Sequence, residues 1–156
     1  MSDSLRDRVL LEALAEVSAH GFSDTVLARA GEKAGASRRE MLDTFPLGAA
    51  SLVEAFSHWA DERMAEQMAS ETSERMRDRV RNTVKARIEA LAPHKNAARR
   101  AAAFLALPQH APLVTRLTMR SVDRMWRAAG DRSSDFSYYT KRGLLAGMPM
   151  PFHWKI

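Results

Sequence analysis

The residues that could carry acid–base or metal chemistry are few in this chain, and no catalytic pattern connects them. The chain has five histidines: His20, His58, His94, His110 and His153. None lies in an H-E-x-x-H or a similar metal-binding spacing, and neither a G-x-S-x-G motif nor a phosphate-binding glycine loop occurs. Glu12, Glu16 and His20 share a helix face, but a polar stripe opposite a leucine stripe is typical of a solvated surface. We predict no catalytic residue, no metal site and no cofactor, and therefore a protein that is not an enzyme.

The composition predicts one cysteine-free domain with an uneven positive charge. The chain has 156 residues and a net charge of +5, and it lacks cysteine and any apolar run of membrane-spanning length. Residues 75–100 contain nine Lys or Arg but only two acidic residues, Asp78 and Glu89. Such an excess of positive charge attracts polyanions such as nucleic acid or anionic lipid. The first ten residues resemble neither a signal nor a transit peptide, so we expect a bacterial-type cytoplasm.

Helical periodicity runs through nearly the whole chain, which predicts an all-α fold. Ser4 is expected to cap a first helix that ends at His20-Gly21, and Asp24 to cap a short second helix that ends at Ala34-Gly35. Ser37 and Glu40 form a capping box, so a third helix should run from Arg38 to Phe45, before Pro46. Two short helices joined by a glycine-containing turn predict a helix-turn-helix.

Further helices are predicted behind this unit. One carries Leu52, Phe56 and Met64, and the next has apolar residues four apart from Met76 to Ile88 and stops at Pro93. Another ends before Pro108, a further one begins near Pro112 and closes at Gly130, and a last one starts near Asp135.

Large and pliable apolar side chains are frequent in these later helices. Methionine and aromatic linings suit irregular hydrophobic ligands such as isoprenoid tails, although an ordinary core has the same spacing. The candidate lipid-binding residues are Phe56, Trp59, Met64, Met76, Phe104, Met125 and Trp126.

The expected recognition helix is poorly suited to a nucleic-acid duplex. Its polar candidates are Arg38, Arg39, Glu40, Asp43 and Thr44. Two of these are carboxylates, and the first fifty residues hold eight acidic against six basic residues. Because phosphates repel carboxylates, DNA is not the expected partner. A ligand-responsive transcriptional repressor remains the alternative function, and an inert helical scaffold is a third.

Two motifs resemble known families. Ala34-Gly35-Ala36-Ser37 followed by Phe45-Pro46 resembles the A-G-V-S…F-P signature of TetR-type regulators, with Gly48 and Leu42 where a lysine and a tyrosine are usual. The thirteen residues from Gly130 to Arg142 resemble the G-D-x-S-x-D-F-N-W-Y-T-K/R-R motif of the TetR-like accessory protein family of ubiquinone biosynthesis. Arg87-Ile88-Glu89 and Trp126 also match, and the likeness covers about residues 5–147.

This resemblance implies a non-enzymatic lipid-binding protein. Family members bind isoprenoid quinone intermediates or phospholipid and present them to the di-iron demethoxyubiquinone hydroxylase. They are homodimers that associate peripherally with a membrane, here the bacterial inner membrane. The family's partner-binding patch falls on Asp135, Phe136, Ser137, Tyr138, Tyr139 and Arg142. Exposed tyrosine and arginine beside a polar loop are also typical interface anchors.

The resemblance and the expected helices together divide the chain into three parts. Residues 1–48 should form the helix-turn-helix unit, and residues 49–148 the helical region that binds ligand and partner. Residues 149–156 should form a non-helical tail, which carries Phe152 and Trp154 where the family continues with further helices.

Overall fold

The protein folds as an all-helical bundle. The computed structural model describes residues 4–72 and 75–130, and within these ranges every regular element is a helix. The elements are α1 (Leu5–His20), α2 (Asp24–Lys33), α3 (Arg38–Thr44), α4 (Ala49–Met68), α5 (Met76–Leu91), α6 (Lys95–Leu105) and α7 (Ala111–Ala128), with short 3₁₀ helices η1 (Ala92–His94) and η2 (Pro108–His110). The predicted all-α, TetR-like fold class is confirmed. The predicted last helix, the partner-binding patch and the tail lie outside the described residues.

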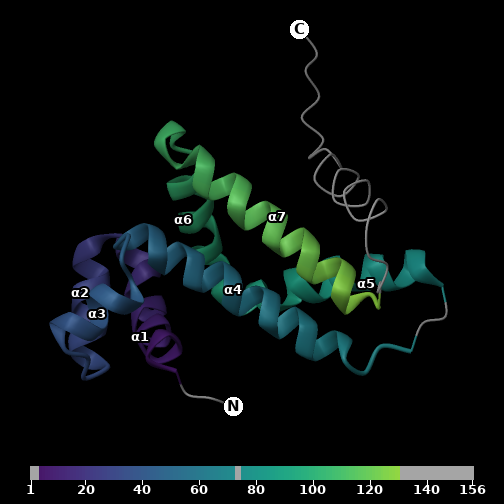
Figure 1. Cartoon of the computed structure of the whole chain (residues 1–156), viewed down its shortest axis with the longest axis horizontal. Coiled ribbons are helices and arrows are strands. Elements are labelled where there is room, and N and C mark those ends of the chain that lie inside the picture. The colour runs from purple at the N-terminus through teal and green to yellow at the C-terminus, as the bar shows by residue number, and fades with distance from the viewer. Residues whose placement is uncertain (1–3, 73–74, 131–156) are drawn as a thin grey trace, which may run out of the picture.

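Local capping sets the ends of the first three helices. The Ser4 side chain accepts a hydrogen bond from the Asp7 backbone N–H at the start of α1, and Gly21 ends that helix. Before α3, Ser37 and Glu40 form both arms of the predicted capping box: the Ser37 hydroxyl accepts from the Glu40 N–H, and the Glu40 carboxylate accepts from the Ser37 N–H. Helices α1, α2 and α3 lie together at one end of the molecule (Figure 1).

The prediction that Asp24 caps the second helix is wrong. The residue before it, Ser23, is the N-cap of α2, and its hydroxyl accepts from the Val26 N–H. The Asp24 carboxylate instead accepts a 2.8 Å hydrogen bond from the Ala49 N–H, in the first turn of α4. Serine is as good an N-cap as aspartate, so Ser23 can cap α2. The Asp24 carboxylate can then accept from an unpaired backbone N–H at the start of α4, 25 residues away in the sequence.

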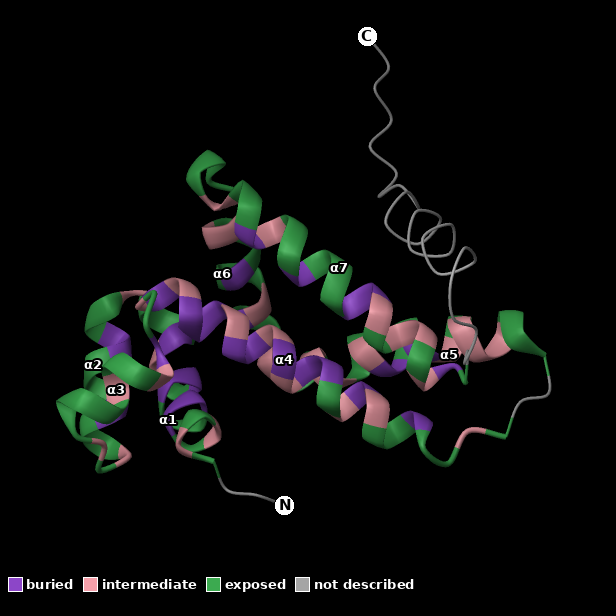
Figure 2. Ribbon diagram, in the orientation of Figure 1, coloured by how far each residue is buried: buried purple, intermediate pink, exposed green. Residues whose placement is uncertain are grey.

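Helix α4 is the central element around which the other long helices pack. It contacts α1 at one end and α5 and α7 along its length (Figure 1). Its buried face is continuous from end to end, as Figure 2 shows, and includes Leu52, Phe56, Ala60 and Met64. The first two belong to the large core shared with α1, α2, α6 and α7, whereas Met64 belongs to a small second cluster with Met68 and Ala86.

Helix α5 buries an unexpected face. The residues it buries are Thr83 and Ala86, both small. Its apolar residues at four-residue spacing lie mostly at the surface of the described structure: Met76 is 36% exposed, Val84 37% and Ile88 63%. Because small residues allow close approach, α5 packs tightly on α4 and leaves its large apolar side chains beside the α4 contact. This packing leaves an apolar groove along α5.

Candidate functional site

A long apolar groove follows α5. Its volume is about 990 Å³, within the range of small-molecule sites. Met76, Val80, Val84 and Ile88 of α5 line it, together with Trp126 of α7. The charged side chains at its edge are Arg77, Arg81, Lys85 and Glu89. The groove therefore offers an apolar surface with a mostly basic border.

A second hollow, of about 420 Å³, adjoins the groove between α4, α5 and α7. Val84 lines both spaces, so the two adjoin at this residue. The walls of the hollow are largely apolar: Leu105, Val114, Leu117, Val122 and Met125. Arg87, Ser57 and Ser121 also line it and introduce a polar group. Together the groove and the hollow form what we call the α5–α7 site.

The polar group is a hydrogen-bonded cluster centred on a buried ion pair. The Arg87 Nε donates to Asp61 Oδ1 at 2.8 Å, and the Ser121 hydroxyl donates to Asp61 Oδ2, also at 2.8 Å. Arg87 Nη2 makes longer contacts to the Ser57 and Ser121 hydroxyl oxygens, at 3.3 and 3.4 Å. The Asp61 side chain is only 1% exposed, whereas that of Arg87 is 23% exposed. This cluster ties α4, α5 and α7 together behind the hollow.

Sequence reasoning missed most of this cluster. Of its members only Arg87 lies in a motif that the sequence reveals, the tripeptide Arg87-Ile88-Glu89, whereas Ser57, Asp61 and Ser121 lie in none. A signal was present in α4: Asp61 lies four residues after Ser57 and eight after the buried Val53, on a row that should face the interior. A carboxylate at such a position predicts a cationic partner, because an isolated buried charge is very costly.

The structure divides the seven predicted lipid-binding residues between separate places. Met76 and Trp126 line the groove, and Met125 lines the adjoining hollow. Phe56 and Met64 are buried in the two cores, 3% and 0% exposed. Trp59 and Phe104 are partly buried against the large core; the Trp59 ring stacks on Phe56 with centroids 6.1 Å apart. Three of the seven thus meet at the α5–α7 site, and their role in lipid binding stays a prediction.

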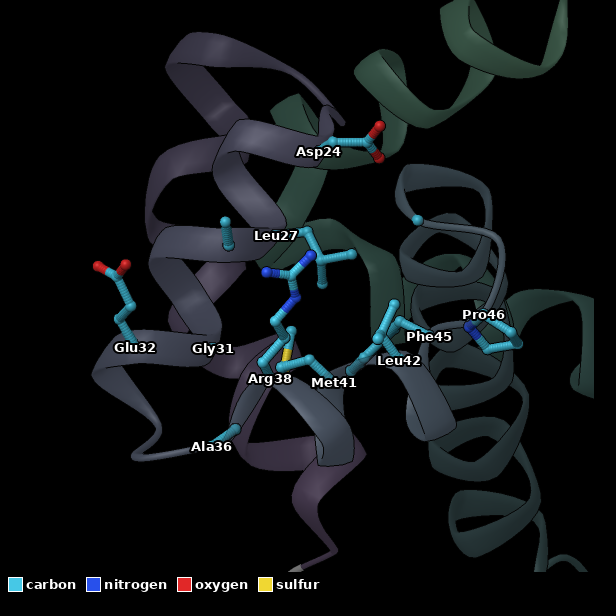
Figure 3. A pocket seen from close by; sticks show the side chains of 12 residues that line it. Asp24, Leu27, Gly31, Glu32, Ala36, Arg38, Met41, Leu42, Phe45 and Pro46 are labelled. Atoms are coloured by element: carbon cyan, nitrogen blue, oxygen red, sulfur yellow. The ribbon is translucent and has the colours of Figure 1, made fainter.

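A separate pocket of about 490 Å³ lies between α2 and α3 (Figure 3). Leu27, Met41 and Phe45 line it, with Asp24 at one end. Beside it, the face that would meet a duplex is unfavourable: Leu42 is 61% exposed and Asp43 is exposed. Glu40, also exposed, is committed to the capping box, where hydrogen bonds from the Ser37 side chain and backbone lower the pKa of its carboxyl. This face presents an apolar side chain and two carboxylates beside Arg38 and Arg39.

His58 is the one histidine buried among the described residues. Its burial lowers the pKa of the imidazole, and the nearby Arg120 lowers it further, while Glu54 opposes the shift. The His58 Nε2 lies 3.7 Å from Glu54 and has no hydrogen-bond partner within the described structure. In those same residues no cluster of three or more His, Asp or Glu could hold a metal ion.

Comparison with known proteins connects this architecture to one family. The COQ9 family model matches residues 111–149, a range that begins with α7, the shared wall of the groove and the hollow. The human protein named ubiquinone biosynthesis protein COQ9, mitochondrial, is 30% identical over 155 residues, covering 94% of this chain and 48% of its own length. The protein of the same name from Drosophila melanogaster is 31% identical, covering 95% of this chain and 47% of its own length.

The chain is similar to COQ9 proteins over nearly its whole length. It spans about half the length of the curated relatives it matches. The family resemblance predicted from the sequence is thereby confirmed. The alignments with COQ9 proteins extend over nearly the whole chain, so they include α4 and α5 as well as the α7 segment. No helix in the described ranges is both long and apolar enough to cross a bilayer.

Proposed function

We propose that this chain belongs to the COQ9 family and is a non-enzymatic accessory protein of ubiquinone biosynthesis that binds an isoprenoid lipid intermediate. The observation that carries the proposal is the α5–α7 site, in which an open apolar groove lies beside a hollow, with Val84 lining both. An isoprenoid chain is long, flexible and apolar, and it needs a surface of this extended shape. Similarity to relatives that are named for ubiquinone biosynthesis supports an isoprenoid quinone precursor over other lipids.

The exposed apolar stripe of α5 supports this role. Large apolar side chains on a solvated helix carry a free-energy cost of about 25 cal/mol for each Å² left in water, and a bound lipid would remove that cost. Met76, Val84 and Ile88 are all at least one-third exposed in the described structure. Contiguous exposed apolar surface commonly marks a ligand or partner site.

The border of the groove favours contact with an anionic membrane surface. Arg77, Arg81 and Lys85 are exposed on α5. Arg81 lies 3.6 Å from Asp78 and Lys85 lies 3.7 Å from Glu89, distances typical of weak ion pairs. Basic residues near anionic lipid contribute about 1 kcal/mol each to adsorption. Peripheral association with an inner membrane and a homodimeric assembly remain part of the proposal.

The proposed protein partner is the di-iron demethoxyubiquinone hydroxylase. The proposed contact is the segment Asp135–Arg142, which matches the family's motif and contains Tyr138 and Tyr139. Replacing both tyrosines with alanine should reduce co-purification of the hydroxylase at least tenfold, because aromatic anchors commonly dominate interface energies. Circular dichroism checks that helicity is retained. Undiminished co-purification by a folded double variant would remove this patch from the proposal.

Organic extraction of the purified protein, followed by mass spectrometry, tests the lipid itself. We expect an isoprenoid quinone precursor in the extract of the wild-type chain. An extract without lipid, from protein prepared without detergent, would contradict the proposed function.

A further inference from the structure

The polar cluster of the hollow has hydrogen-bond donors to spare. Arg87 carries five N–H groups, of which the Nε hydrogen is held by Asp61 and the Nη2 hydrogens make the long contacts to Ser57 and Ser121. In the described part of the chain, Nη1 of Arg87 has no acceptor, and the Ser57 hydroxyl hydrogen has none either. Both side chains line the hollow. Donors without a protein acceptor, on side chains that line an apolar space, are what an oxygen-bearing ligand would satisfy.

The charge of the cluster restricts the kind of oxygen. The Asp61 carboxylate already neutralises the Arg87 guanidinium at 2.8 Å, so the pair has no net charge to offer. A phosphate or carboxylate placed against Arg87 would also approach Asp61, which is nearly inaccessible and has no other cation within salt-bridge distance in the described structure. An uncharged acceptor, such as a quinone carbonyl or a phenol or methoxy oxygen, avoids that repulsion.

We propose that Arg87 and Ser57 bind the uncharged, oxygen-bearing head group of the lipid, while its chain lies along the α5 groove. This inference rests on the proposed function and adds to it the chemical class of the head group and the two side chains that recognise it. With the head in the hollow, the chain would pass Val84, which lines both spaces, and lie among Met76, Val80 and Ile88 of the groove. A bound head group would displace water from the mostly apolar walls of the hollow, which would strengthen each hydrogen bond.

Three probes with the same six-carbon chain distinguish an uncharged oxygen-bearing head group from an apolar one and an anionic one: hexylbenzoquinone, hexylbenzene and hexyl phosphate. Their binding to the full chain is measured by displacement of Nile red, a neutral apolar dye. We expect hexylbenzoquinone to bind wild-type protein about tenfold more tightly than either of the others, as one or two hydrogen bonds to a charged donor would produce. In the double variant Asp61→Leu/Arg87→Met that advantage should vanish, and in Ser57→Ala it should fall about threefold.

The matched control is Glu54→Leu/Arg116→Met, which removes another ion pair joining α4 to α7, at 3.0 Å and outside the hollow. This control should keep the preference for the quinone. If hexylbenzene binds as well as hexylbenzoquinone, the lipid site stands but recognition by Arg87 is wrong. Tighter binding of hexyl phosphate would replace the uncharged head with an anionic one and overturn the inference. If no probe displaces the dye, the proposed function falls together with it.

Discussion

Replacing Gly48 with alanine is expected to destabilise the fold by about 2–4 kcal/mol. Gly48 has φ +58° and ψ −129°, a backbone conformation that side chains rarely adopt. A Cβ at this position would also collide with the Asp24 carboxylate, which caps α4 through the Ala49 N–H. The substitution therefore combines backbone strain with the loss of a helix cap. Urea denaturation followed by circular dichroism measures the change in the free energy of unfolding.

Gly35→Ala is the matched control, because Gly35 has a similar φ of +70° but faces open space: apart from Gly35 and its two chain neighbours, no described residue has an atom within 4 Å of the position that a Cβ would take. It should cost about 1 kcal/mol, the strain alone. In the Asp24→Ala background the cost of Gly48→Ala should shrink, since the steric conflict is gone and the cap is already lost. Equal losses for Gly48→Ala and Gly35→Ala would show that the contact between α2 and α4 carries no weight.

Arg87→Met should destabilise the protein by about 3–5 kcal/mol, because it leaves the Asp61 carboxylate buried without a cation. Asp61 is 1% exposed, and Arg87 and Ser121 donate to its two oxygens. Removing Arg87 eliminates the stronger, charged donor and loosens the attachment of α5 to α4. The same denaturation experiment measures the loss.

Two further variants test why Arg87→Met should lose stability. Arg63→Met removes an exposed pair with Glu66 on the same helix and should change the stability by about 0.5 kcal/mol or less. Asp61→Leu/Arg87→Met removes both charges and should recover most of the stability lost in Arg87→Met, as buried pairs replaced by apolar residues often do. If the double variant is no more stable than Arg87→Met, an uncompensated charge is not the reason for the loss.

Local sequence signals were sufficient to predict the helices of residues 4–72 and 75–130. Ser4 and Ser37 are caps followed three residues later by an acidic side chain, and the structure has both caps. Pro93 separates α5 from α6, and Pro112 lies in the first turn of α7, as predicted. These signals act within one or two turns, so a single sequence contains all the information they need.

Tertiary choices were not predictable in the same way. Asp24 and Ser23 are both good caps, and only the approach of α4 decides which one serves α2. The four-residue spacing in α5 predicts a helix with an apolar stripe, but it does not say that Thr83 and Ala86 face α4 instead. Likewise, Phe56 and Met125 look alike as large apolar residues. One packs in the core and the other lines a hollow, because their helices meet at different places.

Quantitative lipid extraction from three matched proteins tests whether the α5–α7 site holds the lipid. Ile88→Asp places a carboxylate in the groove at a residue that is 63% exposed, so folding should survive. Leu107→Asp is the control: Leu107 is 45% exposed and lies outside the groove, immediately before η2. We predict that Ile88→Asp retains less than about a tenth of the lipid per chain found in the wild type, because a carboxylate in an apolar site is costly, while Leu107→Asp retains all of it. Equal lipid content in the three proteins would contradict lipid binding at the α5–α7 site.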